Sequence, residues 1–416
     1  MSESRMGSAA GLLLPNIRTR RSRLLALLTA LSTLGLLATN LYLPSLPGLA
    51  ADLQVGAADI RLTLTVFLAG LAISQLVVGP LSDRYGRRPV LLAGLALYVA
   101  TSIACALAAS VEMLLLWRVL QAIGACTGVV LVRAVARDLF EGAALTRAMA
   151  VIATLMASAP GFSPLVGGLI ETVWGWRGNF WFVAAFGTVC LLLTLRWIGE
   201  TNRTPTASIA VGRVGRTYMS LLANPLFLGP ALATGFALAA LFAYFSASPQ
   251  LIIDVLGFTP LGFGLLTAGT VFAVFAGGAA GPRIARRLGA TGTLSLGMAM
   301  MAAGAAAMAL LFQAGEITLA GFLAPQILFL AGLGIVNPVG TATALQPFPQ
   351  VAGAASAMLG FLQMAGGTLG TLLLTALPGA FPLTLPLTMG ILALAGLAAL
   401  LLCRALAAPA PVAAGS

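Results

Sequence analysis

Long apolar stretches alternate with short polar segments along the whole chain. Each stretch is long enough to cross about 30 Å of hydrocarbon as a helix, and none has the polar face that a helix of a water-soluble solenoid shows to solvent. The pattern therefore predicts an all-α membrane protein with twelve transmembrane helices. The stretches fall near residues 24–44, 60–80, 90–109, 112–132, 148–170, 179–198, 226–247, 262–282, 291–312, 318–338, 353–375 and 384–403.

Composition leads to the same class. Of the 416 residues, 60% are hydrophobic and 8% are charged, and the mean hydropathy is +1.03. A water-soluble protein needs roughly a quarter of its residues charged. The chain is therefore solvated by lipid, and the composition argues against a soluble enzyme with a single anchor.

The positive charges predict the orientation of the chain. All 22 positive residues are Arg, and they form short clusters between apolar stretches instead of one basic face, so nucleic-acid binding is not expected. With a cytoplasmic N-terminus, nineteen of them lie on the cytoplasmic side. Only Arg61 and Arg177 lie outside, and Arg118 lies within a stretch. Both termini are therefore predicted to be cytoplasmic.

Several kinds of chemistry are unsupported by the sequence. The chain has no His, which excludes zinc sites and catalytic triads that rely on His. Its four Cys residues lie within apolar stretches and show no Cys-x-x-Cys spacing, so they are predicted to be reduced core residues. We expect neither a metal nor another cofactor.

An internal repeat divides the chain into two six-helix halves. Gly79-Pro80 recurs as Gly281-Pro282, and at the same offset of 202 residues Arg84 falls on Arg286. Many transporters build a site between two such copies. The predicted parts are a cytoplasmic segment at 1–23, a six-helix bundle at 24–198, a cytoplasmic linker at 199–225, a second six-helix bundle at 226–404 and a cytoplasmic tail at 405–416.

The segment GPLSDRYGRRP at residues 79–89 is the most specific motif. Its two glycines permit a tight turn and close backbone approach, Asp83 can cap the following helix, and three Arg residues hold the segment on the cytoplasmic side. A plain interpretation is a charged hairpin that only anchors the topology. The full spacing, however, resembles the signature loop of the major facilitator superfamily.

Other segments support this resemblance, which covers residues 24–404. Arg118, Gln121 and Gly124 resemble the family's Arg-x-x-Gln-x-x-Gly motif, and residues 160–168 resemble the Pro- and Gly-rich motif typical of antiporters. Three segments are similar to the bicyclomycin and chloramphenicol resistance branch of drug:proton antiporters. They are residues 42–47, 175–177 and 352–363.

The resemblance implies the major facilitator fold and a transporter that is not an enzyme. In that family the signature loop locks the two halves together on the cytoplasmic face and helps to control alternating access. It also implies that inward proton flow drives export. The implied gating residues are Gly79, Asp83, Arg84, Gly86, Arg87 and Arg88.

Arg118 is informative without the family. It lies about 9 Å along the fourth stretch, where a guanidinium costs at least about 2.5 to 3.5 kcal/mol and needs a partner or a wet cavity. Glu112, six positions away, is poorly placed to pair with it. Two interpretations remain: a structural Arg bonded to backbone carbonyls, or a residue that faces a central cavity and takes part in substrate or proton exchange.

The carboxylates leave the proton-coupling residue open. All eleven fall at predicted helix ends or in loops, and Asn40, which cannot titrate, occupies the position where the branch usually carries an Asp. The simplest proton site of the family is therefore missing. The candidates for the substrate or proton pathway are Asn40, Tyr42, Arg118, Gln121, Pro160, Pro164, Tyr244 and Gln363.

We therefore expect a monomeric transporter in a bacterial inner membrane that exports a small amphiphilic compound in exchange for protons. The missing carboxylate and the field of Arg118 favour neutral to weakly anionic substrates over cations. An importer or facilitator of a small metabolite without classical proton coupling is the alternative. A membrane enzyme or signalling scaffold is disfavoured, because no loop exceeds about 30 residues and no nucleotide-phosphate loop is present.

Overall fold

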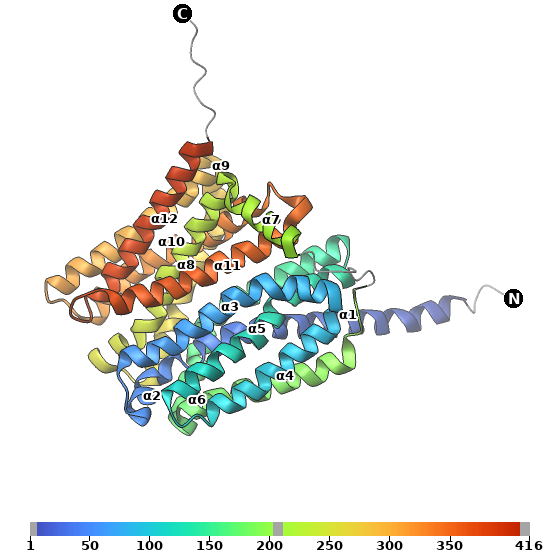
Figure 1. Cartoon of the computed structure of the whole chain (residues 1–416), viewed down its shortest axis with the longest axis horizontal. Helices are drawn as coiled ribbons and strands as arrows, with labels where there is room; N and C mark the ends of the chain where they lie inside the picture. Colours follow the sequence, from blue (N-terminus) through green and yellow to red (C-terminus); the bar gives the residue numbers. More distant parts are fainter. Residues whose placement is uncertain (1–5, 203–210, 408–416) are drawn as a thin grey trace, which may run out of the picture.

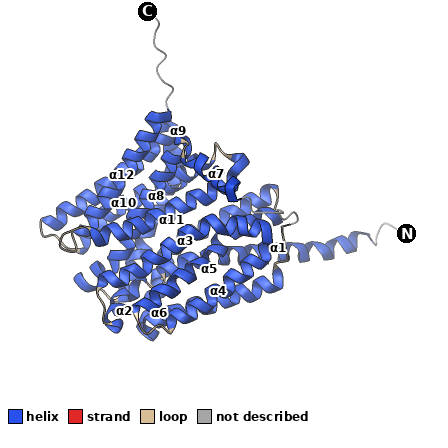
Figure 2. Ribbon diagram, in the orientation of Figure 1, coloured by secondary structure: helices blue, strands red, loops and turns tan. Residues whose placement is uncertain are grey.

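The structure is a computed structural model that describes residues 6–202 and 211–407. Figure 1 shows the course of the chain, and Figure 2 shows that the regular elements of the described residues are helices. Ten of these helical segments are long and apolar enough to cross a membrane. The helices are α1 (Met6–Asn40), α2 (Leu46–Leu53), α3 (Ala57–Tyr85), α4 (Arg87–Ala106), α5 (Val111–Leu139), α6 (Gly142–Trp197), α7 (Val211–Leu222), α8 (Pro225–Pro249), α9 (Pro260–Gln313), α10 (Leu319–Leu345), α11 (Ala352–Ala376) and α12 (Thr384–Ala407).

Two of the segments provide two membrane passes each. The 56-residue α6 contains Gly175 with φ 63° and ψ −173°, and the 54-residue α9 contains Gly289 with φ 69° and ψ 173°. Glycine adopts such positive φ values without steric cost, so the chain bends sharply at these two residues. The ten segments therefore give twelve passes, which confirms the expected number. Both bends lie in the gaps between predicted stretches, at residues 171–178 and 283–290.

The passes gather into two groups that meet along two pairs of helices. Helices α1–α6 pack together and α8–α12 pack together, and the groups meet where α3 contacts α11 and α6 contacts α9. In Figure 1, α12 and α4 diverge toward the C-terminal end of α12. The exact boundaries predicted for the five parts of the chain stay predictions. Residues 1–5, 203–210 and 408–416, which belong to three of those parts, lie outside the described residues.

We name the two ends of the helix bundle by their residues. The arginine-rich end is the end where α3 meets α4, at Arg84, Arg87 and Arg88. The opposite end is the one where the short helix α2 carries Asp52. A 3₁₀ turn at Leu43–Ser45 links α1 to α2.

The internal repeat recurs in the backbone. Pro80 lies inside α3 and Pro282 inside α9. Gly86, with φ 96°, follows Pro80, and Gly289, with φ 69°, follows Pro282. In each half a proline-containing helix is thus followed, within a few residues, by a glycine that reverses the chain.

The linker contains a helix that the sequence pattern did not predict. Helix α7 is amphipathic and places Leu221 almost wholly inside, with 1% of its surface exposed. The hydroxyl of Tyr218 donates a hydrogen bond to the carbonyl of Leu76 on α3 at 3.2 Å. Helix α7 also packs against α8 and α11, so the linker contacts both groups of helices.

The outer surface suits a lipid environment. Large apolar side chains are exposed around the bundle, among them Phe272, Trp174 and Leu402. Such a surface is favourable in hydrocarbon and unfavourable in water. The four Cys residues are free and buried, which confirms the expectation that they are reduced core residues.

Candidate functional site

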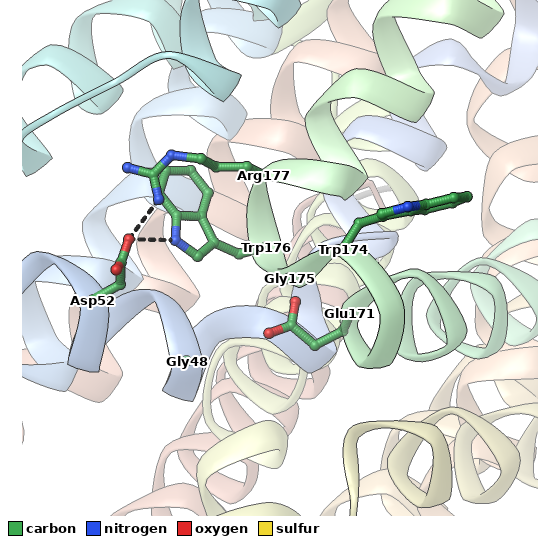
Figure 3. Close-up of a pocket in the computed structure, with 7 residues that line it drawn as sticks. All are labelled: Gly48, Asp52, Glu171, Trp174, Gly175, Trp176 and Arg177. Carbon is green, nitrogen blue, oxygen red and sulfur yellow. Dashed lines mark hydrogen bonds and ion pairs between the residues drawn. The ribbon is translucent and has the colours of Figure 1, made fainter.

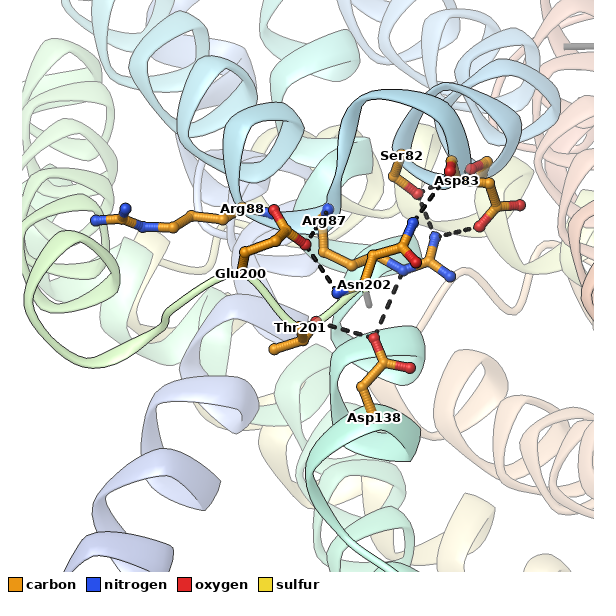
Figure 4. Close-up of polar contacts among 9 residues, drawn as sticks. Ser82, Asp83, Arg87, Arg88, Asp138, Glu200, Thr201 and Asn202 are labelled. Carbon is orange, nitrogen blue, oxygen red and sulfur yellow. Dashed lines mark hydrogen bonds and ion pairs between the residues drawn. The ribbon is translucent and has the colours of Figure 1, made fainter. Parts of the chain in front are cut away.

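The signature loop is held in a network of polar contacts at the arginine-rich end (Figure 4). Arg87, in the first turn of α4, forms an ion pair with Asp83 of α3 at 2.5 Å. The same guanidinium donates to the hydroxyl of Ser82 at 2.5 Å, and its Nε lies 3.7 Å from the carboxylate of Asp138 at the end of α5. Arg87 therefore joins three helices at this end.

Glu200, which follows α6, closes the network from a distant part of the chain. Its carboxylate accepts hydrogen bonds from the backbone N–H groups of Arg87 at 2.9 Å and Arg88 at 3.2 Å. These are unpaired donors at the positive end of the α4 dipole. Burial acts to raise the pKa of Glu200, but the backbone donors of Asn202, Arg87 and Arg88 outweigh it and the pKa is lowered.

The two residues after Glu200 extend this contact. The Thr201 hydroxyl donates to the carboxylate of Asp138 at 2.8 Å, and the Asn202 amide donates to the carbonyl of Asp83 at 3.0 Å. The segment Glu200–Asn202 thus ties the start of the linker to the signature loop. We name it the linker clip.

Gly86 permits the approach of the linker clip. Its φ of 96° is unfavourable for any other residue, and a Cβ at this position would lie 2.5 Å from a carboxylate oxygen of Glu200. The backbone conformation therefore requires glycine here, and the missing side chain leaves the space that the Glu200 carboxylate occupies.

The remaining predicted gating residues have separate surroundings. Arg84 lies over the ring of its neighbour Tyr85, with 5.1 Å from Cζ to the ring centroid, and the Arg88 guanidinium donates to the carbonyl of Leu195 at 3.2 Å. A Cβ at Gly79 would meet nothing within 4 Å. These contacts of the loop all lie within the first group of helices and the linker clip, so a role in gating stays a prediction.

Arg118 lies at the centre of a second polar cluster. Its side chain is 0% exposed. Nη1 donates to the carbonyl of Ala38 at 2.9 Å and to Oε1 of Gln121 at 2.7 Å, and the guanidinium lies over the rings of Tyr42 and Phe67 at 4.6 and 4.1 Å. Nη2 has no hydrogen-bond partner. In this conformation Arg118 does not face an open cavity, and its contacts are those of the structural interpretation.

Two other predicted pathway residues, Gln121 and Tyr42, contact Arg118, and Asn40 lies two residues after Ala38, whose carbonyl Arg118 bonds. The amide of Gln121 donates a hydrogen bond to the Ser102 hydroxyl at 2.8 Å. The hydroxyls of Tyr42 and Thr63 form a hydrogen bond at 3.2 Å. Asn40, at the end of α1, donates to the Leu36 carbonyl at 3.0 Å, while its Oδ1 is buried without a partner. Part of the predicted pathway is thus assembled in one place.

The last four predicted residues lie elsewhere. Pro164 is buried where α6 meets α9, and its carbonyl would lie 2.6 Å from a Cβ at Gly264; Pro160, one turn earlier, is partly buried. Tyr244 is buried in the second group of helices and stacks on Phe322 at 6.2 Å. Gln363 is partly buried on α11. The structure therefore does not gather all eight candidates into one site.

Polar contacts also join the two groups of helices. At the opposite end, Arg61 of α3 donates to the side chain of Gln250 after α8, and its guanidinium lies 5.6 Å from the ring centroid of Phe381. One turn deeper, the hydroxyls of Thr65 and Thr371 bond at 2.9 Å. Toward the arginine-rich end, Arg133 of α5 donates to the Ser356 hydroxyl of α11 at 3.4 Å. The sequence predicts that Arg61 lies outside but indicates no role for it.

Most of the chain is similar in sequence to known membrane transporters of one family. A sequence profile of the Major Facilitator Superfamily matches residues 25–371. The chain is 33% identical to a chloramphenicol resistance protein of Pseudomonas aeruginosa over 362 residues, which cover 85% of this chain and 84% of that protein. It is 30% identical to multidrug resistance protein D of Escherichia coli (strain K12) over 356 residues, covering 85% and 89%.

A solved structure shares the fold. A bacterial homologue of the human lysosomal transporter Spinster, in an inward-facing and unoccupied conformation, superposes with a TM-score of 0.68. The match covers 93% of this chain and 96% of that one at 17% sequence identity. At this identity the likeness concerns the fold alone.

Proposed function

The chain belongs to the Major Facilitator Superfamily, and on this premise we propose that it exports small amphiphilic compounds across a bacterial inner membrane by alternating access, in exchange for protons. Similarity to two resistance proteins along 85% of the chain carries the proposal. Export of a drug-like compound explains why both relatives are named for resistance. Chloramphenicol is the first substrate to test.

The distribution of Arg residues supports one orientation of the protein in the membrane. The arginine-rich end carries Arg84, Arg87 and Arg88 in one short loop, and cytoplasmic loops of membrane proteins are rich in Arg. We place this end in the cytoplasm, and the opposite end then faces outward. Arg61 and Thr65 link the two groups of helices near that outward end, so the described conformation is closed there.

The network around the signature loop supports a role in gating. The linker clip connects the only covalent link between the two halves to Arg87 and Asp83 through Glu200 and Asn202. A movement of the second half relative to the first therefore pulls on the signature loop. We propose that the loop and the clip together set the balance between the two conformations of the transporter.

One observation favours a second candidate function. Asn40 cannot carry a proton, and its buried Oδ1 lacks a partner. A facilitator that moves a small metabolite without proton exchange would need no carboxylate at this position. Transport that survives collapse of the proton gradient would favour this second function.

Drug resistance in a sensitised host tests the proposal. A bacterial strain that lacks its own efflux pumps is transformed with the gene or an empty vector, and the minimal inhibitory concentration of chloramphenicol is measured. We expect at least a fourfold increase with the gene. An unchanged value, together with wild-type amounts of protein in the membrane, would contradict export of this compound, and a panel of neutral, anionic and cationic antibiotics then tests the wider class.

A further inference from the structure

Glu171 differs from the other described carboxylates. Its Oε2 is buried and has no hydrogen-bond partner, whereas Asp83 and Asp138 contact Arg87, and Glu200 accepts backbone hydrogen bonds. Glu112 is exposed at the start of α5. A buried carboxylate oxygen without a donor is unfavourable in its charged form, so the surroundings of Glu171 need an explanation.

A pocket at the opposite end contains this carboxylate (Figure 3). The other charged groups that line it are Asp52 of α2 and Arg177 of α6. They bond to each other at 2.5 Å, and the indole N–H of Trp176 also donates to Asp52 at 2.9 Å. Figure 3 shows these bonds directed at Asp52, with none drawn to Glu171. The cation in the pocket is therefore already paired.

The side chains near Glu171 provide fewer hydrogen-bond donors than their buried acceptor atoms need. Ser45 lies beside Glu171, and the Ser45 hydroxyl accepts a hydrogen bond from the amide N–H of Asn179 at 2.7 Å. The Oδ1 of Asn179 is buried without a partner, as is Oε2 of Glu171. Two acceptors thus lack a donor. One added hydrogen on the carboxyl would remove the charge and turn one of these acceptors into a donor.

Glu171 is partly buried, and its burial is linked to contact between the two groups of helices. Gly168, one turn before Glu171 on α6, is so close to Pro260 and Leu261 at the start of α9 that it has no room for a Cβ. These two α9 residues bring no charge. Separation of α6 from α9 at this end would therefore admit water beside Glu171 and favour the charged carboxylate.

We propose that Glu171 is a proton-binding site, and that proton uptake there from the outward side favours closure of the opposite end. A hydronium ion from the outer water gives one proton to Oε2, which leaves the neutral acid and a water molecule. By linkage, the conformation that holds the proton more tightly is the one that protonation favours. This inference rests on the alternating access of the proposed function, and it makes the outer pH a regulator of that movement.

Distance measurements between spin labels test the inference without any transported substrate. Labels are placed at Gln54→Cys, just after α2, and at Val255→Cys, after α8, in the full-length protein in lipid nanodiscs. Both positions are exposed at this end, whereas the native Cys residues are buried. On lowering the pH from about 8.5 to about 5.5, the ratio of the short to the long distance should rise about tenfold in the parent protein. Glu171→Gln, which supplies the missing N–H donor, should give the short distance at both pH values.

Three variants complete the test. Glu171→Asp should keep the pH response and show that the site tolerates another carboxylate, and Glu112→Gln is a matched control in which the full response is expected. A pH response that persists in Glu171→Gln, that is absent from the parent, or that is lost in Asp52→Asn instead would overturn the inference. A response that depends on Glu171, combined with transport that ignores the proton gradient, would support the inference while contradicting proton-driven export.

Discussion

The carboxylate of Glu200 accepts a hydrogen bond from the backbone N–H of Arg87 at 2.9 Å, although the two residues are 113 positions apart. The bond fixes the segment after α6 to the first turn of α4. Asn202 adds a bond to the carbonyl of Asp83. The signature loop is a local motif in the sequence, but in the structure it is also bonded to the first residues of the linker between the halves.

Replacing Glu200 tests the linker clip. In Glu200→Gln the anion is lost from the N-terminus of α4, and because the group is largely exposed we expect a loss of stability of only about 0.5 kcal/mol. Transport should fall by more than this small loss of stability explains, because the linker would no longer be bonded to the signature loop through Glu200. Thermal unfolding in detergent and chloramphenicol transport measure the two effects.

Acid and a matched variant provide the controls for Glu200. The pKa of Glu200 is lowered in the folded protein, so its stabilisation is present above the ordinary pKa of a glutamate, about 4.3, and is lost as the pH falls through the lower folded value. The difference between wild type and Glu200→Gln should therefore vanish in strong acid. Glu141→Gln, at an exposed position of the same end, should match wild type throughout.

Asp83→Ala should abolish transport and leave membrane insertion intact. The ion pair with Arg87 is partly exposed, with 49% of the Asp83 side chain accessible, and such pairs contribute less than about 1 kcal/mol to stability. The expected loss of transport is therefore caused by impaired gating and not by reduced stability. Resistance and the amount of protein in the membrane are measured together, and normal resistance in a well-expressed Asp83→Ala strain would refute the gating role.

Gly86→Ala should impair both folding and transport. With φ 96° and ψ 152°, Gly86 lies in a backbone region that costs a residue with a Cβ about 1 to 3 kcal/mol, and the new methyl group would meet the carboxylate of Glu200. Gly269→Ala is the matched control, because a Cβ there meets nothing within 4 Å. Equal thermal stability of the two variants would argue against a required approach of Glu200.

Arg118→Ala should lose at least tenfold in transport and about 1 to 3 kcal/mol in stability, since it leaves Oε1 of Gln121 and the carbonyl of Ala38 without their donor. Arg118→Lys should recover little, because an ammonium lacks the planar fork that bonds and stacks here. Arg147→Lys, at an exposed position, serves as the control. Wild-type transport by Arg118→Lys would show that only a charge is needed.

Asn40→Asp should move substrate preference toward cations and strengthen the dependence on the proton gradient. A buried carboxylate compensates a cation that has lost its water, and the Oδ1 of Asn40 has no partner in the present structure. Wild type should export neutral or weakly anionic compounds in preference to ethidium or a tetraphenyl cation. Competition assays compare the two proteins, and unchanged preference and unchanged proton dependence would place Asn40 outside the pathway.

Much of the fold follows from the sequence because the membrane simplifies the problem. Twenty apolar residues must form a helix in hydrocarbon, so the twelve passes could be predicted, and the Gly79-Pro80 repeat recurs as paired proline helices and glycine bends. The amphipathic helix α7 was missed because its polar linker gave no apolar stretch. The reversal at Gly175 within α6 could not be distinguished from a loop.

The site was predictable only where neighbours in sequence are neighbours in space. Arg118 and Gln121 are one helical turn apart and do bond, and a buried Arg bonded to carbonyls was one of the two interpretations. Nothing in the sequence connects Glu200 with Arg87, or Glu171 with Ser45 and Asn179, because these contacts depend on tertiary packing. The linker clip and the pocket at the opposite end therefore emerge only from the structure.

The central claim is that export is driven by protons, and transport by the purified protein in liposomes tests it most directly. With a proton gradient imposed across the liposome membrane, radiolabelled chloramphenicol should accumulate against its concentration gradient on the side from which protons leave, and an uncoupler should abolish the accumulation. Asp83→Ala protein provides the background. Accumulation that is absent in wild type, or a downhill flux that the uncoupler does not change, would contradict proton-coupled export.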